Sequence, residues 1–172
     1  MRINGKGYIA SVIFLVVFAV VSLWKVKGNQ LLYQHNEGLI FGTVYHITYQ
    51  YSEDLQSEIN ALLKRFDKSL SPFNEESIIA AINRNDTAVR VDEYFKTVFS
   101  RSKEIYVASE GAFDPTVSPL INVWGFGFSK ADDITPFKID SLLQMVGMDK
   151  ISLLNGKVIK KDRRMTLNFS AI

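Results

Sequence analysis

A run of uncharged, mostly apolar residues near the N-terminus constrains the fold of this chain more than any other feature of its sequence. The run covers Tyr8–Trp24 and reads YIASVIFLVVFAVVSLW. It is just long enough to cross a bilayer as a helix if the helix is tilted or the membrane is slightly thinned. Lys25 and Val26, which follow it, lack the small side chains of a signal peptidase site. We therefore predict an uncleaved transmembrane helix within residues 1–27, rather than a cleaved signal segment.

Composition narrows the partners and sites that the remaining residues, 28–172, can have. The chain of 172 residues is long enough for one domain with a real core. Its formal net charge of +2 comes from cations scattered among nearly as many acids, so no basic stripe indicates a nucleic acid partner. The absence of cysteine excludes disulfides, thiolate metal sites and a cysteine nucleophile. His35 and His46 lack nearby carboxylates at metal-ligand spacing and are interpreted as ordinary surface or strand residues.

Hydrophobic periodicity and turn signals predict an α+β fold in which helices pack against a mixed or antiparallel sheet. Ser52, Ser77 and Thr135 are predicted helix N-caps, Asp92 precedes a further predicted helix, and Asn155-Gly156 is typical of a tight hairpin turn. The first expected elements are a strand over residues 39–51, a helix from Ser52 to about Ser69 and a short helix that ends at Asn83. A long helix that ends at Gly111 and a shorter helix that ends at Gly147 are expected next. The last expected elements are a hairpin around Asn155-Gly156 and a strand over Met165–Ile172.

The C-terminal residues lead to two further expectations. Four cations that follow the predicted hairpin are interpreted as a solvated turn: Lys160, Lys161, Arg163 and Arg164. The last predicted strand stops at an apolar residue without a polar tail, although the end of an apolar strand needs partners on both sides. We therefore expect the domain to be truncated at its C-terminus.

The stretch Gly111–Phe128, GAFDPTVSPLINVWGFGF, is the main candidate for a binding site, because the sequence contains no Walker loop, GxSxG or HExxH signature. Gly111 is predicted to end one helix, and Asp114-Pro115 to supply the N-cap and first position of the next. Two interpretations remain open. In one, the segment is a buried crossover whose rings only pack. In the other, the rings line a pocket for a flat ligand and Asp114 is its polar anchor.

Several motifs, taken in order, resemble those of one enzyme family. They are Phe41-Gly42-Thr43, Ser71-Pro72-Phe73 followed by Ser77 and Ile82-Asn83, Gly111–Val117, Pro119-Leu120 and Trp124–Gly127. Together they resemble the FAD:protein FMN transferases, the ApbE-type flavin transferases, over about Leu39–Ile172. The final residues, LNFSAI, are similar to the start of the family segment that continues into Ala-Lys-Gly.

The resemblance implies binding of FAD and a Mg²⁺-dependent transfer of its FMN half to a Thr or Ser hydroxyl of a target protein, with AMP leaving. Such enzymes generally act outside the cytoplasm on flavin-carrying subunits of membrane redox pumps. Cations flank both ends of the apolar run, so charge alone leaves the orientation of the anchor open. The resemblance then implies an anchor in the bacterial inner membrane with the soluble part on the periplasmic side.

The resemblance also assigns six residues to the FAD site: Phe41, Phe73, Ala112, Phe113, Asp114 and Ser170. Phe41 matches the start of a strand motif that touches the flavin nucleotide, and Phe73 stands where the family often has an aromatic such as Tyr. Ala112, Phe113 and Asp114 match the core FAD-binding tripeptide. Ser170 falls where a later motif meets the ligand near the metal.

Two parts of the family site have no counterpart in this sequence. The family's metal ligands, and a histidine motif expected to help the acceptor hydroxyl, belong to positions past Ile172. Asp132, Asp133 and Asp162 are interpreted as solvated loop acids, so no metal ligand and no catalytic residue is assigned. We therefore expect the N-terminal part of a flavin transferase that does not complete catalysis alone. The alternatives are a membrane-tethered FAD-binding fragment without turnover, and a pyrophosphatase that hydrolyses FAD to FMN and AMP.

Overall fold

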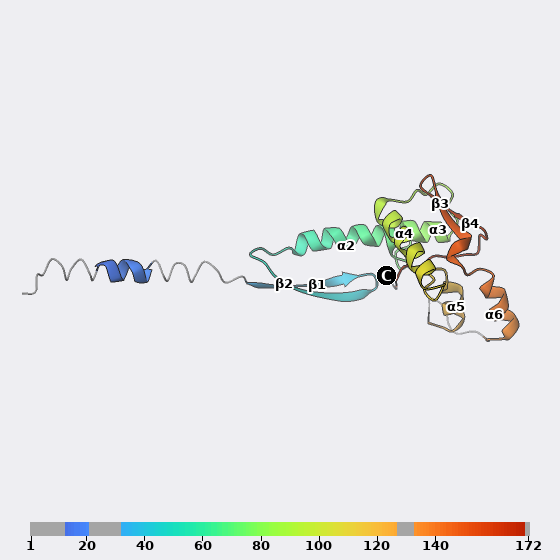
Figure 1. Ribbon diagram of the computed structural model, residues 1–172, viewed down its shortest axis with the longest axis horizontal. Coiled ribbons are helices and arrows are strands. Elements are labelled where there is room, and N and C mark those ends of the chain that lie inside the picture. The colour runs from blue at the N-terminus through green and yellow to red at the C-terminus, as the bar shows by residue number, and fades with distance from the viewer. Residues whose placement is uncertain (1–12, 21–31, 127–132, 171–172) are drawn as a thin grey trace, which may run out of the picture. The chain divides into compact units, whose positions relative to one another are not determined.

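The computed structural model describes residues 13–20, 32–126 and 133–170. Its contacts divide the chain into two units, Met1–Glu37 with His46–Leu55, and Gly38–Tyr45 with Gln56–Ile172. From residue 32 onward, two strands come first, a run of helices follows, and two further strands come last (Figure 1), which confirms the predicted α+β class. The described residues contain two separate two-stranded sheets rather than one larger sheet.

The described part of the predicted anchor is a short helix. Residues 13–20 are helical, and seven large apolar side chains on them are exposed: Ile13, Phe14, Leu15, Val16, Val17, Phe18 and Val20. Among the described residues, the helices are all too short or too polar to span a bilayer. The rest of the uncharged run lies outside the described residues, so the transmembrane helix stays a prediction.

The predicted strand over residues 39–51 is wrong in its bounds, because this region belongs to a hairpin. β1 (Tyr33–Ile40) pairs with β2 (Thr43–Gln50), and only Phe41 and Gly42 lie between them. Both turn residues are left-handed, with φ of 54° and 74°. Two consecutive residues with positive φ match the twist of hairpin strands, but Asn or Asp usually occupies the first position. The sequence did not indicate the turn, because phenylalanine rarely adopts a left-handed backbone conformation.

Both histidines lie on this hairpin and contact the opposite strand. His35 Nδ1 lies 3.0 Å from Thr48 Oγ1, and His46 Nδ1 lies 3.3 Å from Glu37 Oε2. These pairs place residues of β1 directly across from residues of β2. The histidines are therefore strand residues with polar cross-strand partners.

Within the described ranges, five α-helices follow the hairpin: α2 (Gln56–Leu70), α3 (Ile78–Asn83), α4 (Glu93–Ala108), α5 (Ser118–Val123) and α6 (Pro136–Leu143). The predicted N-caps Ser77 and Thr135 are confirmed, whereas the helix expected to start at Ser52 begins at Gln56. Ser77 Oγ accepts a hydrogen bond from the Ala80 N–H, and Thr135 and Asp92 cap α6 and α4 in the same way. Asp92 also accepts a hydrogen bond from Ser69 Oγ at 2.7 Å, which ties the start of α4 to the end of α2.

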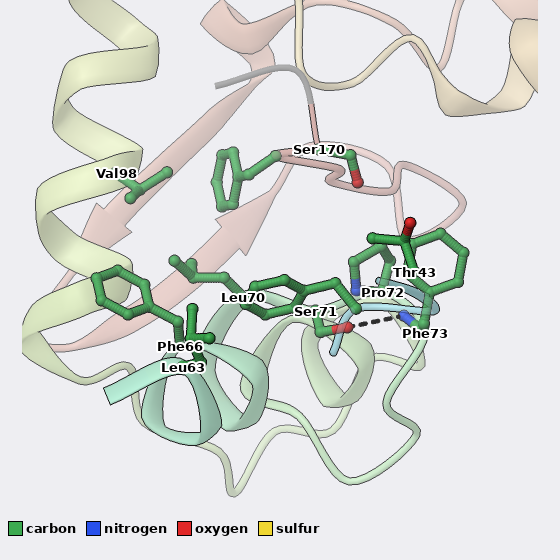
Figure 2. Close-up of a pocket in the computed structure, with 11 residues that line it drawn as sticks. Thr43, Leu63, Phe66, Leu70, Ser71, Pro72, Phe73, Val98 and Ser170 are labelled. Carbon is green, nitrogen blue, oxygen red and sulfur yellow. Dashed lines mark hydrogen bonds between the residues drawn. The ribbon is translucent and has the colours of Figure 1, made fainter. Parts of the chain in front are cut away.

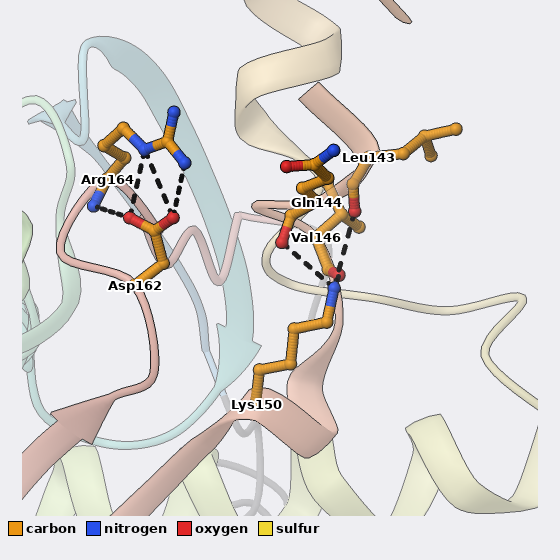
Figure 3. Close-up of polar contacts among 6 residues, drawn as sticks. All are labelled: Leu143, Gln144, Val146, Lys150, Asp162 and Arg164. Carbon is orange, nitrogen blue, oxygen red and sulfur yellow. Dashed lines mark hydrogen bonds and ion pairs between the residues drawn. The ribbon is translucent and has the colours of Figure 1, made fainter. Parts of the chain in front are cut away.

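The end of α6 differs from the prediction. The helix stops at Leu143, and Gly147, with φ of 135°, instead precedes a short 3-10 turn over Met148–Lys150. The Lys150 ammonium donates hydrogen bonds to the carbonyls of Gln144 at 3.0 Å and Val146 at 2.6 Å (Figure 3). A lysine side chain therefore satisfies carbonyls that the sequence pattern assigned to a glycine cap.

The core of the second unit forms where α3 and α4 meet the C-terminal hairpin. β3 (Ile151–Leu154) and β4 (Lys157–Lys160) are antiparallel and are joined by Asn155-Gly156, as predicted. The buried apolar cluster consists of Ile79, Ile82, Val91, Phe95, Phe99, Met145, Met148, Ile151, Met165, Leu167 and Phe169. Phe95 is central, because its ring stacks on Phe99 and meets Phe169 edge-on, with centroids 6.2 and 5.5 Å apart.

The last described segment has the alternating burial pattern of a strand, but it is not assigned as the predicted strand. Met165, Leu167 and Phe169 are buried, with half-buried residues between them. The backbone of Leu167 bonds to a side chain: its N–H donates to Asn83 Oδ1 at 2.8 Å and its carbonyl accepts from Asn83 Nδ2 at 2.9 Å. The alternating pattern was read correctly, but an asparagine amide takes the place of a neighbouring strand.

The interpretation of Lys160 as a solvated residue is wrong. Its ammonium donates hydrogen bonds to the carbonyls of Ile82 at 3.0 Å and Met165 at 2.9 Å. Burial, together with the Arg163 guanidinium, lowers its pKa. Lys160 thus joins the end of α3 to the last segment, while Lys161, Arg163 and Arg164 are exposed as predicted.

Candidate functional site

A pocket of about 440 Å³ opens beside the turn of the first hairpin. We call it the hairpin pocket. It is lined by Phe41, Thr43, Leu63, Phe66, Leu70, Ser71, Pro72, Phe73, Val98, Phe169 and Ser170. Figure 2 shows Phe66 and Val98 at one end and Thr43 and Phe73 at the other. Most of its lining is apolar or aromatic, and its size is in the usual range for small-molecule sites.

The left-handed turn places backbone and side chain at the mouth of the pocket. Phe41 and Thr43 both line the pocket, and Gly42 between them lies beside the Phe73 ring. A Cβ on Gly42 would lie 3.6 Å from that ring. Ser71 is buried, and its Oγ accepts a hydrogen bond from the Phe73 N–H at 3.3 Å (Figure 2). The Phe73 backbone is thereby held, while its side chain stays 57% exposed.

Two helices supply the apolar wall. Leu63 and Phe66 come from α2 and Val98 comes from α4. Phe66 also packs on Tyr94, with ring centroids 4.6 Å apart. The apolar stripe of α2 therefore has two roles, because part of it packs against α4 and part of it faces an open cavity.

The C-terminal segment closes the pocket on another side. Phe169 is buried against Phe95 and also lines the pocket, and Ser170 follows it. The Ser170 N–H donates to Asn168 Oδ1 at 2.9 Å. Three predicted site residues, Phe41, Phe73 and Ser170, therefore surround one cavity, although they are far apart in sequence.

The other three predicted residues, Ala112, Phe113 and Asp114, lie together in the turn that follows α4. They do not line the hairpin pocket. Gly111 has the predicted left-handed conformation, with φ of 83°, and its N–H donates to the Tyr106 carbonyl at 2.8 Å.

The predicted helix N-cap at Asp114 is wrong. Helix α5 begins at Ser118, four residues later, and Asp114 closes a local turn instead. Its Oδ1 accepts hydrogen bonds from the Thr116 N–H at 2.8 Å and from Thr116 Oγ1 at 2.6 Å. A short carboxylate that bonds the backbone two residues ahead is typical of an Asx turn.

One backbone hydrogen bond connects this turn with the wall of the pocket. The Asn168 N–H donates to the Pro115 carbonyl at 2.8 Å. Asn168 precedes Phe169 and Ser170, whereas Pro115 follows Asp114. A backbone hydrogen bond thus joins the segments that carry the two groups of predicted site residues.

The aromatic residues after α5 do not fit the buried-crossover interpretation of their segment. Trp124 is 42% exposed and Phe126 is 84% exposed, so the segment is not a buried crossover at these positions. Neither ring lines the hairpin pocket. Residues 127–132 lie outside the described part of the chain, so the end of the Gly111–Phe128 stretch, and with it Asp132, is not placed.

The charged groups near these segments have local partners. Loss of hydration, together with the carboxylates of Asp149 and Asp114, raises the pKa of Tyr106, whose hydroxyl donates to Asp149 Oδ1 at 3.2 Å. The Arg164 guanidinium holds the pKa of Asp162 at about 2 through hydrogen bonds to its carboxylate (Figure 3). Asp162 is therefore paired with Arg164, although it lies in a surface turn.

The donor atoms of the described residues do not fit a magnesium site. Within the described ranges, no group of three or more His, Asp or Glu side chains is arranged to hold a metal ion. Mg²⁺ requires oxygen ligands in near-octahedral geometry, usually including one or two carboxylates. No metal-dependent step is assigned to these residues.

The sequence patterns missed part of the pocket wall. Leu63, Phe66 and Val98 fit the apolar stripes of their helices, and a stripe alone does not tell which positions face a partner helix and which face a cavity. Thr116 was also missed as a contact of Asp114. Its place two residues after an Asp was the available signal, because Asx turns bond that position.

The chain is similar to flavin transferases over most of its length. Residues 41–172 match the model of the ApbE family. A curated Haemophilus influenzae protein named FAD:protein FMN transferase is 32% identical over 132 residues, which are 70% of this chain and 38% of that protein. A Vibrio cholerae protein of the same name is 28% identical over 138 residues, or 74% of this chain and 41% of that protein.

Solved structures show the same similarity. The flavin transferase ApbE from Vibrio cholerae superposes with a TM-score of 0.74 at 26% identity, covering 82% of this chain and 49% of that one. The apo form of a flavinyl transferase ApbE from Pseudomonas stutzeri gives a TM-score of 0.72 at 24% identity and supports the fold alone. The chain thus spans about half, or less, of the length of these matched proteins.

Proposed function

The chain belongs to the ApbE family, and from this premise we propose that it supplies an FAD-binding part of an FAD:protein FMN transferase. The hairpin pocket carries this proposal. It gathers Phe41, Phe73 and Ser170, which the motifs assign to an FAD site, around one apolar cavity. A planar heteroaromatic ring suits such a cavity, because rings and aliphatic side chains contact its faces while backbone groups remain available at its edge.

We assign different parts of a dinucleotide to the two groups of residues. The exposed Phe73 ring and the Phe41 turn contact one flat ring of FAD in the hairpin pocket. Asp114 binds a polar group of the ligand, because its carboxylate is half-buried at the turn that contacts the Ser170 segment. The remaining site residues, Ala112 and Phe113, position that turn.

The described residues do not account for the transfer step itself. An acceptor Thr or Ser hydroxyl would attack the phosphorus of the FMN half, the bond from that phosphorus to the AMP oxygen would break, and AMP would leave. Its dependence on Mg²⁺ is implied by the family resemblance. The described residues contribute binding and orientation of FAD to this reaction, and we assign none of them to metal binding or proton transfer.

The direct test of this proposal is an FAD titration of the chain followed by quenching of flavin fluorescence. We expect saturable binding of FAD, with competition by FMN or AMP identifying which half occupies the hairpin pocket. No saturable quenching up to millimolar FAD would contradict the proposed function.

Phe73→Ala should weaken FAD binding by roughly 5- to 150-fold, because a ring stacked on a heteroaromatic face contributes about 1–3 kcal/mol. Phe73 is largely exposed, so the free energy of unfolding should change little. Phe137→Ala is the matched control, since that ring is 84% exposed and does not line the pocket. Equal FAD affinities of the two variants would show that Phe73 does not contact the ligand.

We also propose that the chain is anchored in the bacterial inner membrane with its soluble part on the periplasmic side. The support is the exposed apolar helix at residues 13–20, within an uncharged run, because lipid would remove these side chains from water. The full chain should therefore remain in the membrane fraction after alkaline carbonate washing, and protease added to spheroplasts should cleave the soluble part. Release by carbonate, or protection from protease, would contradict this arrangement.

A further inference from the structure

Thr116 occupies an unusual position beside the predicted anchor of the ligand. Its side chain is completely buried, yet its hydroxyl makes two hydrogen bonds. Oγ1 donates to Asp114 Oδ1 at 2.6 Å and accepts from the Gly147 N–H at 2.7 Å. A buried hydroxyl that both donates and accepts has its direction fixed at both ends. Thr116 therefore connects the Asp114 turn to the chain that follows α6.

The contacts of Thr116 restrict the carboxylate of Asp114. Oδ1 receives two hydrogen bonds from Thr116, one from the backbone and one from the hydroxyl. Among the described residues, none donates a hydrogen bond to the other oxygen, Oδ2. Since one carboxylate oxygen is held, the rotation of the side chain is fixed and the second oxygen keeps its acceptor capacity for a ligand.

The second hydrogen-bond partner of the Thr116 hydroxyl is the N–H of Gly147, and its position requires a glycine backbone. Gly147 has φ of 135°, a conformation that L-residues with a side chain rarely adopt. A Cβ at this position would lie 2.7 Å from Asp149 Oδ1 and 3.2 Å from Lys150 Cε. Gly147 thus gives its N–H the direction that reaches Thr116, which fixes the hydroxyl from the side opposite to Asp114.

From these contacts we propose that Thr116 is the positioning residue that orients the Asp114 carboxylate toward its ligand. This inference rests on the proposed function, in which Asp114 contacts FAD. Thr116 does not itself touch the ligand, because its side chain is fully buried and its hydroxyl is used by Asp114 and Gly147. Its effect on binding passes entirely through Asp114.

Thr116→Val is the informative change, because valine keeps the branched shape and removes only the hydroxyl. We expect FAD affinity to fall about 10-fold, and Thr116→Ser to restore most of it, since serine returns the hydroxyl without the methyl group. Asp114→Ala should lower the affinity at least as much. In the Asp114→Ala background, Thr116→Val should cause no further loss, because the residue acts through a carboxylate that is no longer present.

A second readout needs no FAD. Three-bond NMR couplings of Asp114 should report a single side-chain rotamer in the unmodified chain and in Thr116→Ser, and averaging between rotamers in Thr116→Val. Far-UV circular dichroism confirms that each variant is folded, and Gly147→Ala, whose Cβ would force the backbone and its N–H away from Thr116, gives a second route if Thr116→Val does not fold.

The two readouts separate the inference from the proposed function. Absence of FAD binding by the unmodified chain would defeat the proposed function, while the rotamer of Asp114 would still show whether Thr116 positions it. An unchanged Asp114 rotamer in a folded Thr116→Val chain would overturn the inference. Additive losses of FAD affinity for Thr116→Val and Asp114→Ala would overturn it as well, because they would mean that Thr116 acts independently of Asp114.

Discussion

Phe95→Ala should lower the free energy of unfolding by about 3–5 kcal/mol, the range for removing a large aromatic side chain from a well-packed core. Phe95 is completely buried, and its ring contacts Phe99 and Phe169. Alanine would leave a cavity between α4 and the last described segment. Urea denaturation followed by circular dichroism measures this loss.

The same change should also reduce FAD binding, because Phe169 packs on Phe95 and lines the hairpin pocket. Phe95→Leu is the control for cavity size and should recover more than half of the lost stability. A loss below about 1 kcal/mol for Phe95→Ala would contradict the packing of this core, since such values are typical of exposed sites.

Asn83→Ala should destabilise the chain by about 2–4 kcal/mol, because it leaves both backbone groups of Leu167 without their partners in a buried environment. The loss of structure should begin at the last described segment, around Leu167. Hydrogen exchange at the Leu167 amide should become fast, while the amides in the centre of α4 stay protected as long as the chain is folded.

Arg84→Ala provides the comparison for Asn83. Arg84 follows Asn83 at the end of α3, but its guanidinium is exposed and donates to the Glu75 carbonyl. We expect this variant to lose less than about 1 kcal/mol and to leave exchange at Leu167 unchanged. Similar exchange at Leu167 in both variants would show that Asn83 does not hold the last segment.

Local patterns predicted those parts of the fold whose causes are local. Ser77, Asp92 and Thr135 each cap a helix because a side-chain oxygen reaches an N–H three residues ahead, and sequence alone encodes that spacing. Asn155-Gly156 was recognised for the same reason, since both residues tolerate the positive φ of the turn.

The errors concern contacts between distant residues. Phe41-Gly42 also makes a turn with positive φ at both residues, yet phenylalanine gives no sequence signal for such a turn. In the structure, this turn lies against the Phe73 ring. The backbone of Leu167 bonds to Asn83, more than eighty residues earlier, and Lys160 bonds to carbonyls from two segments. Neither partner follows from periodicity, because each depends on how separate elements pack.

At the candidate site, too, local patterns predicted some features, while contacts between distant residues were missed. The family motifs named Phe41, Phe73 and Ser170, and the fold places all three around one pocket. They also named Asp114, but the helix-cap role inferred from Asp114-Pro115 is replaced by a turn that Thr116 stabilises. The apolar positions Leu63 and Val98 became pocket residues only once α2, α4 and the hairpin turn were placed together.

The most direct test of the central claim is to map the FAD site by NMR, recording the backbone amide spectrum of the isotope-labelled chain during an FAD titration. We expect the largest shift changes at Gly42, Thr43, Phe73 and Ser170, with a second group around Asp114. Saturable changes confined to other surfaces, such as the exposed Trp124 and Phe126, would contradict the assignment of the hairpin pocket as the FAD site.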